Sequence, residues 1–350
     1  MINAYTSAKF QVISAFCMVM VVFIHSYNYD IKTIGSELYV QHSFIFFFEN
    51  FVSNGLGRIA VPIFFAISSY LFFINISDLK QFPTKLKKKL RTVALPCLLW
   101  SVWGLVLYFF LQSIPFSKSF FTKDLVSTYS TSKIFSTVFL NPIPYQLWFL
   151  QNLFILMLIS PIIYFLIKFF GYGLLLSTMF LWFIHGNQNI IFIESLNYFV
   201  LGASIAVLHP GAVLFKFRKQ FWIMGIAWGI VLMFSTMTID NEKFDSLRRI
   251  NILVGIPAAW TLYDVMFSQT DWSKMKYFKH LKYSFFIYIF HEPSLVIIKK
   301  ALLHLLPKNQ FSIILTYIAA PIIIVLISII IGNFINKNFK KFYAVLTGGR

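Results

Sequence analysis

Apolar residues fill most of this chain in long runs that short polar segments interrupt. A helix needs roughly 20 mostly apolar residues to cross a membrane, so each long run predicts one transmembrane helix. The pattern predicts about ten such helices, over residues 10–28, 58–76, 92–112, 146–167, 173–186, 194–210, 220–238, 249–267, 284–298 and 311–335. The fifth and ninth runs are short, which favours broken or tilted helices. A further apolar stretch, 43–52, is too short to span a membrane, and we expect it at the interface or partway into the membrane.

The composition favours an all-α, polytopic integral membrane protein. Hydrophobic residues make up 58% of the 350 residues, charged residues make up only 12%, and 43 residues are Phe. This is too apolar for a soluble enzyme or a disordered chain. The runs also lack the alternation of outer-membrane barrel strands. We expect one transmembrane domain over residues 1–350 and no cleavable signal peptide, since no small-residue cleavage site follows the first run.

The net charge of +18 is distributed in a way that predicts orientation. If the N-terminus is cytoplasmic, nineteen of the 30 Lys and Arg residues lie inside and eleven lie outside. This bias follows the positive-inside rule and predicts that both termini are cytoplasmic. Membrane topology therefore explains the charge, and we expect no nucleic-acid partner. Cys17 and Cys97 lie within apolar runs, and no cluster of His, Cys, Asp and Glu has metal-ligand spacing, so we expect no metal site.

Ionisable residues inside the apolar runs are the candidates for chemistry, because they are costly in lipid unless they face a cavity. His25, near the outer end of the first run, suits either an interfacial position or a general base. Arg58 opens the second run, where it is either an interfacial anchor or a cation that stabilises negative charge. His291 and Glu292 lie inside the ninth run before the helix-breaking Pro293. They form either a structural pair or part of a polar cavity.

Three further features have both a structural and a functional explanation. Ser68 lies in the middle of a run, where small residues usually permit close helix packing. Trp148 begins the fourth run, where Trp often lies at the membrane interface. The basic run from Lys85 to Arg91 either signals topology or binds phosphate groups.

Taken in order, these segments resemble the membrane-bound acyltransferase-3 family, whose members acylate sugars. The family's opening helix ends in a His, as residues 23–26 do here (Phe-Ile-His-Ser). The other matching segments are 58–71, similar to Arg-x-x-Val-Pro-x-Phe-Phe…Ser-Gly-Tyr-Leu; 147–150 with Pro161, similar to its Trp-Phe-Leu helix; 283–291, similar to Ser-Phe…Tyr-x-x-His; and the basic run that includes Arg91, similar to its cytoplasmic loop. Two positions depart from the pattern: Ser14 stands where the family has Arg, and Ser69 stands where it has Gly.

The resemblance implies an O-acyltransferase that moves an acetyl or other short acyl group from acyl-CoA to a sugar hydroxyl. The implied acceptor is a cell-surface glycan (O-antigen, capsule or exopolysaccharide) or a lipid-linked saccharide. The implied location is a bacterial inner membrane, with membrane lipids as partners and acetyl-CoA or another acyl-CoA as donor substrate rather than bound cofactor. We assign His25 as general base and Arg58 as the stabiliser of oxyanion charge, with His291 and Glu292 orienting His25 or contacting the donor. The candidates for binding donor or acceptor are Ser68, Trp148, Lys88, Lys89 and Arg91.

Two other functions stay open. Ten spans and buried ionisable residues also suit a transporter or flippase for a lipid-linked sugar, although the two halves of the chain show no repeat. Ser14 leaves open a relative that has lost catalysis. Turnover of an acyl donor separates the enzyme from both alternatives.

Overall fold

The computed structural model describes residues 2–27, 43–115, 121, 124–184, 190–272 and 278–349, and these ranges contain helices and no strand. The α-helices are α1 (Ala4–Ser26), α2 (Phe44–Asn50), α3 (Ala60–Phe73), α4 (Phe82–Lys89), α5 (Leu95–Ser113), α7 (Thr131–Phe139), α8 (Trp148–Leu158), α9 (Ser160–Phe170), α10 (Gly173–Ile184), α11 (Ile190–Leu208), α12 (Gln220–Met237), α13 (Asp245–Phe267), α14 (Ser284–Leu305), α15 (Gln310–Asn338) and α16 (Lys340–Thr347). The π-helical turns are η1 (Phe51–Leu56) and η4 (Leu90–Ala94). The 3-10 turns are η2 (Gly57–Ile59), η3 (Leu79–Gln81), η5 (Val126–Thr128), η6 (Tyr145–Leu147), η7 (Pro210–Leu214), η8 (Glu242–Phe244) and η10 (Phe278–Tyr283).

Each of the ten predicted runs contains a helix. In the described part of the chain, seven helical spans are long and apolar enough to cross a membrane, and the bent pair α8–α9 makes an eighth. The remaining two runs are α10, an apolar helix too short for that test, and α14, which the buried His291 and Glu292 interrupt. The chain is therefore an all-α, polytopic integral membrane protein, as the sequence predicts.

The prediction of a separate short segment at 43–52 is wrong. One continuous helical span runs from Phe44 to Phe73, through α2, η1, η2 and α3. The polar and glycine residues that suggest a break at 53–57 instead let other helices pack closely. A Cβ on Gly55 would lie 2.5 Å from Leu232, and a Cβ on Gly57 would lie 2.8 Å from Ile24.

Two other boundaries differ from the sequence-based expectation. The basic cluster before Pro96 is not a loop, because α4, η4 and α5 form one helical span, Leu79–Ser113. The fourth run, rather than the fifth, is broken: α8 and α9 meet at an angle of 61° just before Pro161. The expected break in the ninth run is present, since Glu292 has φ −109° and ψ 134° inside α14.

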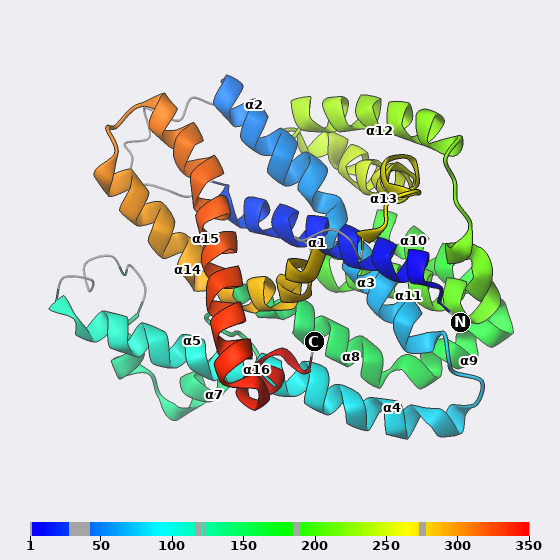
Figure 1. Ribbon diagram of the computed structural model, residues 1–350, viewed down its shortest axis with the longest axis horizontal. Coiled ribbons are helices and arrows are strands. Elements are labelled where there is room, and N and C mark those ends of the chain that lie inside the picture. Colours follow the sequence, from blue (N-terminus) through cyan, green and yellow to red (C-terminus); the bar gives the residue numbers. More distant parts are fainter. Residues whose placement is uncertain are drawn as a thin grey trace.

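Helix α1 crosses the middle of the bundle, and Figure 1 shows α3, α14 and α15 beside it. Near its start, Lys9 forms an ion pair of 2.8 Å with Asp264 of α13, and both side chains are fully buried. Helices α3 and α11 also approach closely, since a Cβ on Gly202 would lie 2.0 Å from the carbonyl oxygen of Ala66. These contacts fix the walls of a cavity inside the bundle.

Candidate active site

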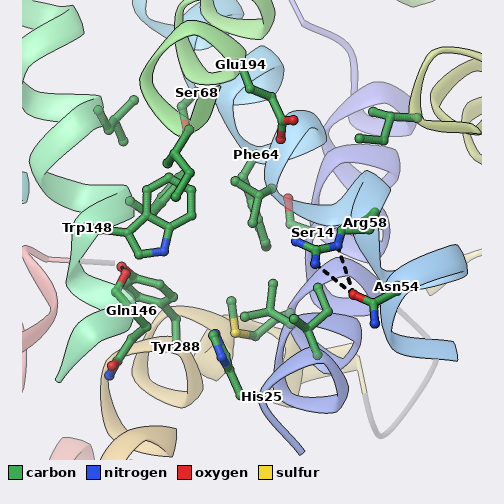
Figure 2. A pocket seen from close by; sticks show the side chains of 18 of the residues that line it. Ser14, His25, Asn54, Arg58, Phe64, Ser68, Gln146, Trp148, Glu194 and Tyr288 are labelled. Atoms are coloured by element: carbon green, nitrogen blue, oxygen red, sulfur yellow. Dashed lines mark hydrogen bonds between the residues drawn. The ribbon is translucent and has the colours of Figure 1, made fainter. Parts of the chain in front are cut away.

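A cavity of about 900 Å³ lies within the bundle (Figure 2). Its walls come from α1, the Phe44–Phe73 span, α8, α11, α14 and the turn between α12 and α13. Most of the residues assigned from the sequence meet here, and those that line the cavity are His25, Arg58, Ser68, Trp148 and Lys89.

His25 lies in the last turn of α1, on the same helix face as the cavity-lining Ser14, Met18 and Val21. Its Nδ1 atom forms a hydrogen bond with the hydroxyl of Tyr145, which belongs to η6 at the start of the α8 segment. This partner fixes the orientation of the imidazole. Sequence reasoning missed Tyr145, although it directly precedes the segment that carries Trp148.

His291 and Glu292 do not line the cavity. Both are buried, and the His291 ring lies behind His25 with the two ring centroids 5.2 Å apart. Nδ1 of His291 donates to the carbonyl of Ile287 at 3.1 Å. In the described part of the chain, no hydrogen bond joins His291 to Glu292, and His291 Nε2 and Glu292 Oε1 are buried without a partner. The suggested structural His–Glu pair is therefore absent from these residues.

Gln146 supports the break in α14. Pro293 has no N–H, so the carbonyl of Ile289, four residues earlier, loses its usual helical donor. The Nε2 amide of Gln146 donates to that carbonyl at 3.4 Å and to the carbonyl of Glu292 at 3.1 Å. In return, the hydroxyl of Tyr288 donates to the carbonyl of Gln146 at 2.6 Å. The broken helix is therefore locked to the start of α8, which also positions Tyr145 beside His25.

Arg58 lies in the middle of the Phe44–Phe73 span, and not at its start as the sequence suggests. Its side chain lines the cavity (Figure 2). Asn54, one turn earlier, accepts hydrogen bonds from Nε of Arg58 at 3.2 Å and from its terminal nitrogen at 2.7 Å. Asn54 in turn donates to Asn50 at 2.8 Å. This ladder holds the guanidinium at the wall of the cavity that His25 and Glu194 also line.

Ser68 and Trp148 line another wall. Ser68 faces the cavity from α3, whereas its neighbour Ser69 faces α11 and donates to the carbonyl of Phe199. The ring of Trp148 packs against Phe65 with a centroid distance of 6.4 Å. Trp148 is thus part of the bundle interior rather than of a belt at its surface.

The basic cluster reaches the cavity through one residue. Lys89, the last residue of α4, lines it, whereas Lys88 and Arg91 are exposed and do not. The cluster predicted as one binding surface is therefore divided by helical geometry, since neighbouring residues on a helix point in different directions.

Glu194 also lines the cavity, and sequence reasoning missed it. The criterion that identifies His291, an ionisable residue within an apolar run, identifies Glu194 as well. It is an ionisable residue one turn inside an apolar helix, after Phe192 and Ile193. The predicted run 194–210 begins at Glu194, so this residue stood at the predicted end of a helix and was not recognised as lying inside one.

The match to known proteins covers almost all of this architecture. A family model described as an acyltransferase domain matches residues 9–333. The chain belongs to this acyltransferase-3 family. It is also 26% identical to the succinoglycan biosynthesis protein ExoH of Rhizobium meliloti (strain 1021), over 362 positions that cover 99% of this chain and 94% of that protein. No solved structure matches the chain.

The segments that carry the family resemblance meet at the cavity. The end of α1, the Phe44–Phe73 span, the start of α8 and the broken helix α14 all contribute to its walls. Ser14, where the family pattern has Arg, also lines it, three helical turns before His25. An arginine at that position would therefore face the cavity.

Proposed function

We propose that this chain is an O-acyltransferase that moves an acetyl or other short acyl group from acyl-CoA to a sugar hydroxyl of a cell-surface glycan. The depth of the cavity carries this proposal. Its lining on the Phe44–Phe73 span follows one face from Asn50 to Leu71. That is a rise of about 30 Å at roughly 1.5 Å per residue, comparable to the hydrocarbon thickness of about 30 Å. One cavity can thus admit a donor at one end and an acceptor at the other.

The donor is proposed to enter beside Lys89, at the end of α4. Coenzyme A carries phosphate groups, and an ammonium at the cavity wall can bind one of them. The exposed Lys88 and Arg91 would attract the anionic donor to this end. Ser68 and Trp148 also line the cavity and would contact the acyl-carrying arm.

The reaction needs a base and a stabiliser of negative charge. If Nδ1 of His25 donates to the Tyr145 oxygen, its Nε2 lone pair can accept the proton of the sugar hydroxyl. The hydroxyl oxygen then attacks the thioester carbonyl, and Arg58 stabilises the oxyanion that forms. When the carbon–sulfur bond breaks, the leaving thiolate takes the proton from His25. The products are the acylated sugar and the coenzyme A thiol.

The acceptor is proposed to be a glycan or a lipid-linked saccharide on the outer side of a bacterial inner membrane. A relative named for succinoglycan biosynthesis supports a glycan acceptor. That name also makes succinyl a donor group to test beside acetyl. The net charge distribution supports the orientation, with α4 on the cytoplasmic side.

The test uses membrane vesicles that contain the full chain, labelled acetyl-CoA or succinyl-CoA, and the glycan of the host. We expect label to reach the glycan with the wild-type chain and not with His25→Ala. His304→Ala is the matched control, because this exposed histidine near the end of α14 does not line the cavity. Label transferred equally by wild type and His25→Ala would remove His25 as the base.

Failure of the wild-type chain to transfer either group would contradict the proposal. Ser14→Arg, which restores the family residue on the cavity wall, then decides between two causes. Activity gained by this variant would identify a relative that has lost catalysis. Continued inactivity would favour transport of a lipid-linked sugar.

A further inference from the structure

One end of the cavity is lined by charged side chains from four elements. They come from η2 in the Phe44–Phe73 span, the start of α11, the turn between α12 and α13, and the start of α13. The group comprises Arg58, Glu194, Asp240, Asp245, Arg248 and Arg249. Arg58 and Glu194 lie within apolar spans, where ionisable residues are costly unless they face water or a ligand, and the four other residues adjoin them from the turn and the start of α13.

The group is held in place by its own contacts. Asp245 pairs with Arg249 at 2.8 Å and with Arg248 at 3.3 Å. Arg249 also donates to the carbonyls of Trp182 and Phe183, which tie it to the end of α10. Arg248 donates to the carbonyl of Ile239 in the α12–α13 turn. These contacts fix Asp245, Arg248 and Arg249 in place at the cavity wall.

The charges in this group balance, with three guanidiniums against three carboxylates. Among the described residues, the acidic side chains that line the cavity all belong to this group. Phosphate groups would be repelled by carboxylates at this end. Guanidiniums only donate hydrogen bonds and carboxylates only accept them, whereas a sugar hydroxyl does both. A balanced mixture of the two therefore suits a neutral ligand rich in hydroxyl groups.

Two of these residues retain capacity for a ligand. The side chain of Asp240 is exposed at the turn. The side chain of Arg248 remains 36% accessible, although its terminal nitrogens already contact Asp245 and the carbonyl of Ile239. Asp240 and Arg248 lie on the lining of the same cavity as His25 and Arg58, where the acyl transfer is proposed to occur.

We propose that this group, at the α12–α13 end of the cavity, binds the acceptor, and that the acceptor unit bound there is a neutral, hydroxyl-rich sugar. This inference rests on the proposed function. It adds the substrate class and the residues that recognise it. It also separates the acceptor end from the donor end of the cavity.

The experiment measures KM for both substrates in vesicles that contain the full chain, with Asp240→Asn and Arg248→Gln. We expect each variant to raise the KM for the acceptor about tenfold, the effect of one lost hydrogen bond to a charged group. The KM for acyl-CoA should not change. Lys243→Gln is the matched control, because this exposed lysine lies in the same turn and does not line the cavity. Asp240→Asn keeps the test valid if Arg248→Gln weakens the fold.

Acceptor charge provides the second arm. The wild-type chain should have a lower KM for a neutral oligosaccharide than for one of equal length that carries a uronate. Offering the neutral oligosaccharide both free in solution and on a lipid anchor identifies which source supplies the sugar. Unchanged acceptor KM values in both variants, or a preference for the uronate, would overturn the inference while leaving the proposed function intact. Absence of transfer by the wild type to any saccharide would overturn the proposed function and this inference with it.

Discussion

The imidazole rings of His25 and His291 are stacked, with centroids 5.2 Å apart and an angle of 29° between their planes. They come from opposite ends of the chain, one from the last turn of α1 and the other from the break in α14. His291 is fully buried and its Nδ1 is bonded to the carbonyl of Ile287, so its ring is fixed in place. It therefore forms a rigid support behind the histidine that lines the cavity.

This stacking predicts a positioning role for His291. We expect His291→Ala to lower kcat by about tenfold to a hundredfold with little change in KM, because loss of the support lets the His25 ring move. His291→Phe, which keeps a flat ring, should restore most of the rate. Initial rates of acyl transfer in vesicles measure both variants. A His291→Phe variant as slow as His291→Ala would mean that the imidazole itself takes part in the chemistry.

The hydrogen bond between Tyr145 and His25 should be needed for fast transfer. Tyr145→Phe keeps the ring and removes the hydroxyl that holds Nδ1. We expect kcat to fall about tenfold, as one hydrogen bond of roughly 1.4 kcal/mol implies. Tyr172→Phe is an unusually close control, because Tyr172 forms the same type of bond with His209 at 2.8 Å outside the cavity lining. Equal rates for the two variants would contradict an orienting role for Tyr145.

Arg58 should contribute through its charge and its shape. Arg58→Gln is expected to lower kcat by about 10²- to 10³-fold, the loss typical of an oxyanion-stabilising group. Arg58→Lys keeps the charge but not the planar fork that Asn54 holds, so we expect an intermediate rate. Arg218→Gln, at an exposed site outside the cavity lining, serves as the control in the same kinetic assay. The role fails if Arg58→Gln retains the wild-type rate.

Hydrophobic runs predicted the class of fold well, because segments that cross lipid must form long apolar helices. They placed His25 correctly at the end of α1. They failed at 53–57, where polar residues and glycines looked like a boundary and instead accommodate Ile24 and Leu232 from neighbouring helices. A single sequence carries no sign of such tertiary contacts, and so Arg58 was assigned to the wrong part of its helix.

Sequence reasoning could find the site residues whose side chains are individually unfavourable in lipid. His291 and Glu292 stood out because lipid penalises them, and Glu194 would have stood out by the same rule. Tyr145 could not be found in this way, because a tyrosine beside an apolar run is ordinary. Its contact with His25 depends on how Gln146 locks η6 to the broken helix, which only the folded chain reveals.

The buried ion pair between Lys9 and Asp264 should dominate the stability of the N-terminal half of α1. Lys9→Met leaves the Asp264 carboxylate buried without its ammonium, and removing one partner of such a pair costs about 3–5 kcal/mol. Asp264 keeps hydrogen bonds from Tyr5 and from the backbone of Phe217, which places the loss at the lower end of that range. Thermal unfolding of the purified chain in detergent measures the effect. The double variant with Asp264→Leu should recover much of the loss, and a double variant less stable than Lys9→Met would contradict this.

Lys89 and Lys88 are neighbours in sequence that should behave differently towards the donor. Only Lys89 lines the cavity, whereas Lys88 is exposed to the surroundings. We expect Lys89→Gln to raise the KM for acyl-CoA about tenfold, because it removes one charged hydrogen bond to a phosphate. Lys88→Gln should leave that KM unchanged at moderate salt, where the attraction from an exposed charge is screened. Titration of both variants with acyl-CoA at fixed acceptor concentration measures the difference. Equal increases in both would show that the donor binds along the outer surface of α4 and not in the cavity.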